Sequence, residues 1–208
     1  MDHEKESAGD PIPPNCVVIE VRVAELKQLF NAIDPSPFRE RDLDPKAEEF
    51  IVGGAREARR DAVFALLVHL DRPAGLPEEA AALKAAVEEF FTQRSQVTMR
   101  RLHQLFRNGR TSLLIGTAFL TAAVGVGNLI ATAMNGHQLG DLLREGVLIG
   151  GWVAMWRPLE IFLYGWWPLL AEARLFRRLA AMPVRIAYSE AADDPHAWRR
   201  DWPATPVR

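Results

Sequence analysis

Arg157 and Glu160 pose the sharpest chemical question in this sequence, because they interrupt a long apolar stretch. They lie three residues apart, a spacing that brings two side chains together on one face of a helix. A charged residue in the middle of a membrane helix costs roughly 2.5–3.5 kcal/mol on insertion scales, so the pair needs a reason to be there. One reason is functional: a gate, or an ion or proton path lined by several subunits.

Two structural reasons stand beside the functional one. In the first, the charges neutralise each other within one helix, or bond to backbone groups that Pro158 leaves without a partner. In the second, the crossing is shorter than its length indicates, and Arg157 lies close to the lipid headgroups. The self-neutralised pair is the favoured interpretation, and the other two stay open.

A second group of residues that could do chemistry lies between residues 31 and 50. Its carboxylates could bind a divalent cation and its arginines could hold a phosphate; the candidates are Asp34, Arg39, Arg41, Asp42, Asp44 and Glu48. The spacing does not match a calcium-binding loop, which needs alternating acids, a central glycine and a terminal glutamate. The favoured alternative is structural, since Asp44 before Pro45 is well placed to cap a helix and Glu48 suits its positive end.

The remaining residues form no pattern typical of an enzyme. The five histidines, at positions 3, 69, 103, 137 and 196, are scattered without metal-ligand spacing. Zinc-protease, P-loop, dinucleotide-binding and serine-hydrolase motifs are all missing from the sequence. We therefore predict no catalytic residue, no metal and no cofactor, and we favour a protein that is not an enzyme. The net charge of −2 gives no reason to expect nucleic acid as a partner.

An uncharged segment, Thr111–Met134, dominates the second half of the chain. About 20 residues suffice to cross a hydrocarbon core of roughly 30 Å, and this segment has 24. A buried helix of a small soluble domain would rarely run this long without a charge. The segment therefore predicts a first transmembrane helix and a lipid bilayer as partner.

Small residues recur along this helix at the spacing that brings them onto one face. Gly116, Ala123 and Gly127 are the expected packing positions, because small side chains let two helix backbones approach closely in lipid. The packing partner is either the second apolar segment of the same chain or a neighbouring subunit. The pattern alone does not choose between them.

The second apolar segment, residues 146–170, is interrupted by the charged pair and by Pro158. Neither apolar half is long enough to cross a membrane alone, so we expect one transmembrane helix kinked at Pro158. Residues 135–145 form the short connecting loop. Arginines flank the pair of helices: five precede the first (residues 94, 100, 101, 107 and 110) and four follow the second (174, 177, 178 and 185), whereas the loop has only Arg144. Both termini are therefore expected in the cytoplasm.

The segment before the membrane helices, residues 16–110, is predicted to be a cytosolic α/β domain. Alternating apolar residues predict a strand at 16–23, and a short apolar run predicts another at 62–70. Helices are expected at 24–33 and 45–60, followed by a long helix, 78–110, that leads into the membrane. The expected fold class is thus α+β, a small domain of about two strands, two helices and one long helix followed by a two-helix transmembrane hairpin.

The ends of the chain are predicted to lie outside this core. Residues 1–15 and 187–208 are expected to be disordered tails, and residues 171–186 a cytosolic basic helix. Because two strands make an unstable sheet, either the chain holds further strands that these patterns do not show, or subunits pair to complete the sheet. The single cysteine, Cys16, excludes an internal disulfide and suits a reducing compartment. Together with the small-residue helix face, these features favour a homo-oligomer.

Two blocks, NAIDPSPFRERDLDPKAEEFIVGGARE and GGWVAMWRPLEIFLYGWWP, resemble uncharacterised bacterial inner-membrane proteins with two transmembrane helices. The resemblance implies a bacterial inner-membrane location and carries no activity. We expect an interaction or scaffold protein that displays a cytosolic domain to a cytosolic or membrane protein partner. The alternatives are a subunit of an oligomeric channel or transporter that uses Arg157 and Glu160, and a membrane-tethered metal-dependent enzyme.

Overall fold

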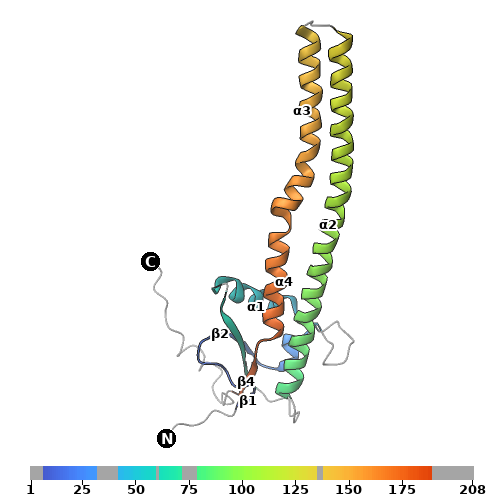
Figure 1. Cartoon of the computed structure of the whole chain (residues 1–208). Helices are drawn as coiled ribbons and strands as arrows, with labels where there is room; N and C mark the ends of the chain where they lie inside the picture. Colours follow the sequence, from blue (N-terminus) through green and yellow to red (C-terminus); the bar gives the residue numbers. More distant parts are fainter. Residues whose placement is uncertain (1–6, 32–41, 60, 72–78, 135–137, 189–208) are drawn as a thin grey trace. The chain divides into compact units, whose positions relative to one another are not determined.

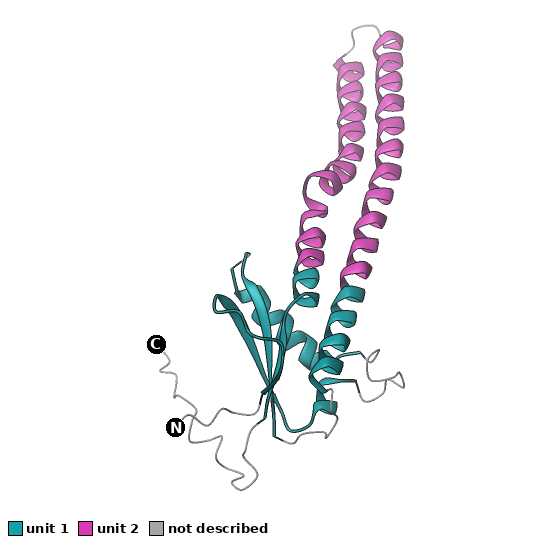
Figure 2. Ribbon diagram, turned by 60° about the horizontal axis from the view of Figure 1, so that its bottom comes forward, with its two compact units in different colours: residues 1–94, 175–208 teal, residues 95–174 magenta. Residues whose placement is uncertain are grey.

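The computed structural model describes residues 7–31, 42–59, 61–71, 79–134 and 138–188, and combines a small β-sheet with long helices (Figure 1). The predicted α+β class is confirmed in this form. The chain divides into two compact units, residues 1–94 with 175–208 and residues 95–174 (Figure 2). Each unit is described on its own below.

The first unit is built on a four-stranded sheet in the order β1-β4-β3-β2. The strands are β1 (Ser7–Gly9), β2 (Cys16–Val23), β3 (Val63–Leu70) and β4 (Val184–Tyr188). Strand β3 pairs in parallel with both β2 and β4, and β1 pairs antiparallel with β4. The prediction of strands at 16–23 and 62–70 is confirmed, with β3 beginning one residue later.

The prediction of only two strands is wrong. Strand β1 lies within the expected N-terminal tail, and β4 lies where we expected the end of a basic helix and the start of the C-terminal tail. Both are too short to show a periodic pattern, with three and five residues. Strand β4 begins directly after Pro183, at which the preceding helix has already ended. Pairing within the chain therefore extends the sheet to four strands.

Helices cover one face of the sheet and enclose the core of the first unit. They are α1 (Pro45–Glu57), the first turns of α2 (Glu79–Ala133) and the last turns of α4 (Trp167–Ala180). Alternate strand residues point toward them, and the core from the sheet includes Ile19, Phe64, Leu66, Val68, Leu70, Val184 and Ile186. The predicted helix 45–60 is confirmed as α1, three residues shorter than expected.

The helix predicted at 24–33 is wrong. Only a single 3-10 turn, η1 (Leu26–Leu29), forms there. Leu26 and Leu29 still enter the core, as their spacing indicated. The chain then becomes extended at Phe30, which forms a β-bridge with Leu43. This bridge brings the start of α1 back to the end of η1, and it replaces the helical hydrogen bonds that Phe30 and Asn31 would have made; residues 32 and 33 lie outside the described part.

The second unit is a hairpin of two long helices that lie side by side (Figure 1). It contains α2 from residue 95 onward, α3 (Gln138–Glu160), a single π-helical turn, η3 (Ile161–Gly165), and the first part of α4. The expected outer loop of residues 135–145 is too long, because α3 already begins at Gln138; residues 135–137 lie outside the described part. Asp141, Arg144 and Glu145 are therefore helical.

The hairpin is inserted into a crossover of the sheet. Strands β2 and β3 are joined through η1 and α1, whereas β3 and β4 are joined through all of α2, α3, η3 and α4. The chain thus leaves the first unit in α2 and re-enters it in α4. Both apolar helical segments of the hairpin are long and apolar enough to cross a membrane.

Candidate functional site

The seam between α2 and α3 is made by small residues on α2. A Cβ placed on Gly116 would lie 3.0 Å from Met155 Sδ and 3.1 Å from the Ala154 carbonyl oxygen. Gly127 lies in the same way against Arg144, and buried Ala123 lies against Gly151 of α3. In the structure, the packing partner of the three predicted small residues is therefore the second apolar segment of the same chain.

Two further glycines of this seam were not among the predicted packing positions. A Cβ on Gly109 would lie 2.9 Å from Ile161, and one on Gly151 would lie 2.9 Å from Leu120. Gly109, Gly116 and Ala123 follow one another at seven-residue intervals, which is the repeat of a helix–helix seam. That repeat was the signal available in the sequence.

The face of α3 directed away from α2 has a different character. Gly146 and Gly150 have no atom within 4 Å of a Cβ placed on them. Val153, Arg157 and Glu160 continue the same line at alternating spacings of three and four residues, and all three are exposed. We call these five residues the outer stripe. In the described residues of the hairpin, no side chain covers this stripe.

Arg157 and Glu160 form an ion pair within their own helix. Arg157 Nη1 donates a hydrogen bond to Glu160 Oε2 at 2.9 Å, and the two side chains are 72% and 51% exposed. A guanidinium has five N–H groups, so this contact leaves most of its donors for other acceptors. The pair is thus close to neutral overall, and Arg157 can still donate hydrogen bonds to groups outside its own helix.

The level of the pair along the hairpin follows from its neighbours. Pro158 lies beside Gly116 and Ile161 lies beside Gly109, so the intervening Arg157–Glu160 pair is level with residues 109–116 of α2. The uncharged segment of α2 begins at Thr111. The charged pair therefore lies at the end of the apolar span, next to the arginine-rich side, and not at its centre.

The backbone of the second apolar segment is irregular at this level. Pro158 lies inside α3 without ending it, and the π-helical turn η3 follows after Glu160. Because proline has no N–H, the Ala154 carbonyl lacks its usual helical donor, and this is the carbonyl that faces Gly116. The expected single helix over residues 146–170 thus lies within one helical span, Gln138–Ala180, whose irregularity is the π-helical turn that follows Pro158.

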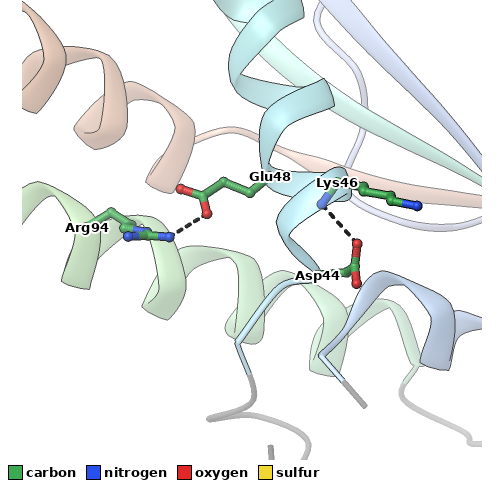
Figure 3. A network of polar contacts seen from close by, with 4 residues as sticks. All are labelled: Asp44, Lys46, Glu48 and Arg94. Atoms are coloured by element: carbon green, nitrogen blue, oxygen red, sulfur yellow. Dashed lines mark hydrogen bonds and ion pairs between the residues drawn. The ribbon is translucent and has the colours of Figure 1, made fainter. Parts of the chain in front are cut away.

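The acidic block of the first unit is held in structural contacts (Figure 3). Asp44 Oδ1 accepts a hydrogen bond of 2.9 Å from the backbone N–H of Lys46 and caps α1. Glu48 pairs with Arg94 of α2, whose guanidinium also lies 5.3 Å from the ring centre of Phe90. Asp42 is exposed. Asp34, Arg39 and Arg41 lie outside the described residues.

Titratable groups elsewhere in the first unit do not assemble into a metal site. Among the described residues, no group of three histidine, cysteine or acidic side chains could hold a metal ion. His69 lies on the sheet face opposite the helices, with its Nε2 3.6 Å from Glu20 Oε2, too far for a hydrogen bond. The thiol of Cys16 donates to the Pro13 carbonyl at 3.0 Å. The distinctive arrangement in the described chain is therefore the hairpin.

Comparisons with protein-family models, with curated proteins and with solved structures give no match to this chain.

Proposed function

We propose that this protein is a membrane-anchored interaction or scaffold protein of the bacterial inner membrane. Its hairpin crosses the bilayer, and its α/β unit binds a partner on the cytoplasmic side. The observation that carries the proposal is the exposure of large apolar side chains along the hairpin. They include Leu114, Ile115, Phe119, Leu129, Trp152, Val153 and Trp156. Only 17% of the most apolar stretch of each helical segment is buried, whereas the core helix of a soluble protein is mostly buried.

The charges that flank the hairpin support the proposed orientation. Exposed arginines lie on α2 before Thr111 and on α4 after Trp167, whereas the connecting end has Arg144 with Asp141 and Glu145. Short flanking segments rich in arginine stay in the cytoplasm. Residues 7–71 and the strand β4 then lie on the cytoplasmic side, and Gln138 lies on the opposite side.

We further propose that the protein is a homo-oligomer. The incomplete sheet no longer supports this, because the chain supplies four strands itself. The support now comes from the outer stripe of α3. Its two glycines contact nothing in the described chain, and its charged pair is exposed next to apolar surface. In a parallel pair of α3 helices, the two glycines would allow close approach, and each Arg157 would reach the partner's carboxylate at Glu160.

Cysteine labelling of the full-length chain in membranes tests the anchor and its orientation. An impermeant maleimide should label Gln138→Cys in intact spheroplasts of a Cys16→Ser background. Native Cys16 of the wild-type chain should be labelled only after the membrane is permeabilised. Extraction of the chain by alkaline carbonate, or labelling of Cys16 in intact spheroplasts, would contradict the proposal.

Disulfide cross-linking tests the homo-oligomer. Val153→Cys and Trp152→Cys are matched, because both positions are 67% exposed on α3. They point about 100° apart, since a helix has 3.6 residues per turn. In the Cys16→Ser background, copper-phenanthroline oxidation should cross-link Val153→Cys into dimers and leave Trp152→Cys largely monomeric. Equal yields at the two positions would mean random collision and would refute the proposed interface.

A channel or transporter subunit remains the second candidate, because the charged pair is exposed and lies next to the irregular η3 turn. π-Helical turns occur frequently at functional sites. The pair is, however, at the end of the apolar span and bonded within its own helix. Liposome flux through the wild type should then be lost in Arg157→Leu/Glu160→Leu. Unchanged flux in that variant would remove the candidate.

A further inference from the structure

Five arginines on the side of the hairpin opposite Arg144 have no carboxylate partner among the described residues. Arg100, Arg101, Arg107 and Arg110 on α2 and Arg174 on α4 are all exposed. Within the described part of the chain, none of their guanidinium groups forms an ion pair or a hydrogen bond. Arg94, six residues before Arg100 on α2, shows the contrast, because it is neutralised by Glu48. We call the five residues the arginine belt.

Arg107 and Arg110 of the belt lie at the edge of the apolar span, whereas Arg174 is level with Ser95, whose hydroxyl donates to the Ala173 carbonyl. Arg110 directly precedes the uncharged segment, and Arg107 is one turn further from it. Gly109 contacts Ile161 and Phe162, and Leu105 contacts Gly165, so these arginines are level with the η3 turn. At about 1.5 Å of rise per residue, Arg100 and Arg101 lie roughly 10–15 Å further from the apolar span than Arg110.

Aromatic residues at the same level mark this edge as a membrane interface. Tyr164 and Trp167 are exposed large side chains, and Trp166 donates its indole N–H to the Phe162 carbonyl at 3.0 Å. Tyrosine and tryptophan are enriched at the level of lipid headgroups because their rings are apolar with a polar tip. The arginines nearest this level, Arg107 and Arg110, therefore face headgroups and not water alone.

We propose that the arginine belt binds the phosphate groups of anionic phospholipids. This inference rests on the proposed membrane insertion of the hairpin. A guanidinium binds phosphate oxygens through two parallel N–H bonds, and these guanidinium groups have no competing acid in the described chain. A zwitterionic lipid offers the same phosphate with a cation beside it, so the net positive belt selects anionic headgroups. The apolar and aromatic surface next to the belt fits a lipid better than a soluble anion.

The expected selectivity follows from the number of arginines. A cation near an anionic membrane surface contributes about 1 kcal/mol, which is roughly a fivefold change in binding. Removing two of the arginines nearest the headgroups should therefore weaken the preference for anionic lipid by roughly 30-fold at low salt. The three arginines further out should contribute less and should be the first to be screened by salt.

The full-length protein in nanodiscs provides the test. Discs of phosphatidylcholine with a minor share of phosphatidylglycerol are disrupted, and native mass spectrometry counts which lipid stays bound. Wild type should retain phosphatidylglycerol preferentially, and Arg107→Gln/Arg110→Gln should lose most of that preference. Arg22→Gln/Arg59→Gln is the matched control, because it removes the same charge from exposed arginines of the first unit and should behave as wild type.

The outcomes separate this inference from the proposed function. A chain that inserts into discs of either composition and retains both lipids equally would overturn the lipid selectivity alone. A chain that fails to insert in any disc would overturn the membrane anchor as well. Free inorganic phosphate that displaces the retained phosphatidylglycerol at modest concentration would show a soluble-anion site and would also overturn the proposal.

Discussion

Replacing single glycines of α2 by alanine should separate the packed face of the hairpin from its open face. Gly116 and Gly125 lie nine residues apart in the same uncharged segment. A Cβ on Gly116 would lie 3.0 Å from Met155 Sδ and 3.1 Å from the Ala154 carbonyl oxygen, whereas a Cβ on Gly125 would have no atom within 4 Å. The two positions thus share their sequence context and differ in their surroundings.

The expected effects follow from two opposing contributions. Alanine is more favourable than glycine inside a helix by about 1 kcal/mol, and this gain applies at both positions. At Gly116 the methyl group also overpacks the seam at a cost of about 1–3 kcal/mol, because the Ala154 carbonyl is backbone and moves little. Gly125→Ala should therefore stabilise the hairpin by up to about 1 kcal/mol, and Gly116→Ala should be less stable than Gly125→Ala by about 1–3 kcal/mol.

Unfolding of the full-length chain by SDS in mixed micelles measures this difference. Far-UV circular dichroism and the fluorescence of the six tryptophans should report the same transition for both variants. Equal stability of Gly116→Ala and Gly125→Ala would refute the packing of α2 against α3 at this level.

Three further predictions concern the first unit, each measured by chemical unfolding of the full-length chain. Asp44→Ala should cost about 1 kcal/mol because it removes the cap of α1, and Asp44→Asn should retain most of that stability. A double-mutant cycle between Glu48→Ala and Arg94→Ala should give a coupling of at most about 1 kcal/mol, reduced by salt, since the Arg94 side chain is 46% exposed. A coupling of zero would mean that the pair does not join α1 to α2. The hydrogen bond and charge of Asp10, 2.8 Å away, raise the pKa of Lys84 above its ordinary 10.5. The ion pair should therefore stabilise the fold below about pH 10.5, and this stabilisation should be lost as the pH rises through the raised pKa of Lys84. Lys84→Met should abolish that pH dependence, and a wild-type profile unchanged by the substitution would contradict it.

Local sequence patterns predicted the strands and helices whose own residues show a recognisable periodicity or capping sequence. Strand β2 alternates apolar and polar residues, and α1 begins with Asp44-Pro45, a capping residue followed by a proline in the first turn. Strands β1 and β4 have no such signal, because they are stabilised by pairing across most of the chain, as Ser7 pairs with Ala187. Of the two explanations for an unstable two-stranded sheet, further strands and pairing between subunits, the structure supplies the further strands.

The candidate site was predictable only in part, for a related reason. Small residues at helical spacing identified Gly116, Ala123 and Gly127 as packing positions. The four-residue spacing of small residues alone does not separate Gly116 from Gly150, because Gly146 and Gly150 have the same spacing in an apolar helix. The difference is tertiary: one faces α3 at van der Waals distance, and the other faces away from the rest of the hairpin. The sequence likewise does not show which arginines form ion pairs: Arg94 pairs with Glu48, and Arg107 has no ion pair among the described residues.

In the proposed membrane-spanning hairpin, the two helices would place different demands on the bilayer. The uncharged segment of α2 has 24 residues, about 36 Å at 1.5 Å per residue, which exceeds a hydrocarbon core of about 30 Å. The longest uncharged run of α3, residues 146–156, is about 16 Å long. Glu145 and Arg157, which bound this run, must therefore both lie within the length of the uncharged segment of α2. Long side chains can extend toward the headgroups at either end, but the Arg157 side chain lies on the outer stripe, where lipid or a second copy must cover it. A second copy of the chain offers a carboxylate to Arg157, whereas lipid tails offer none. Because α3 has exposed charges at this level and the uncharged segment of α2 has none, we expect association through α3 and not through α2.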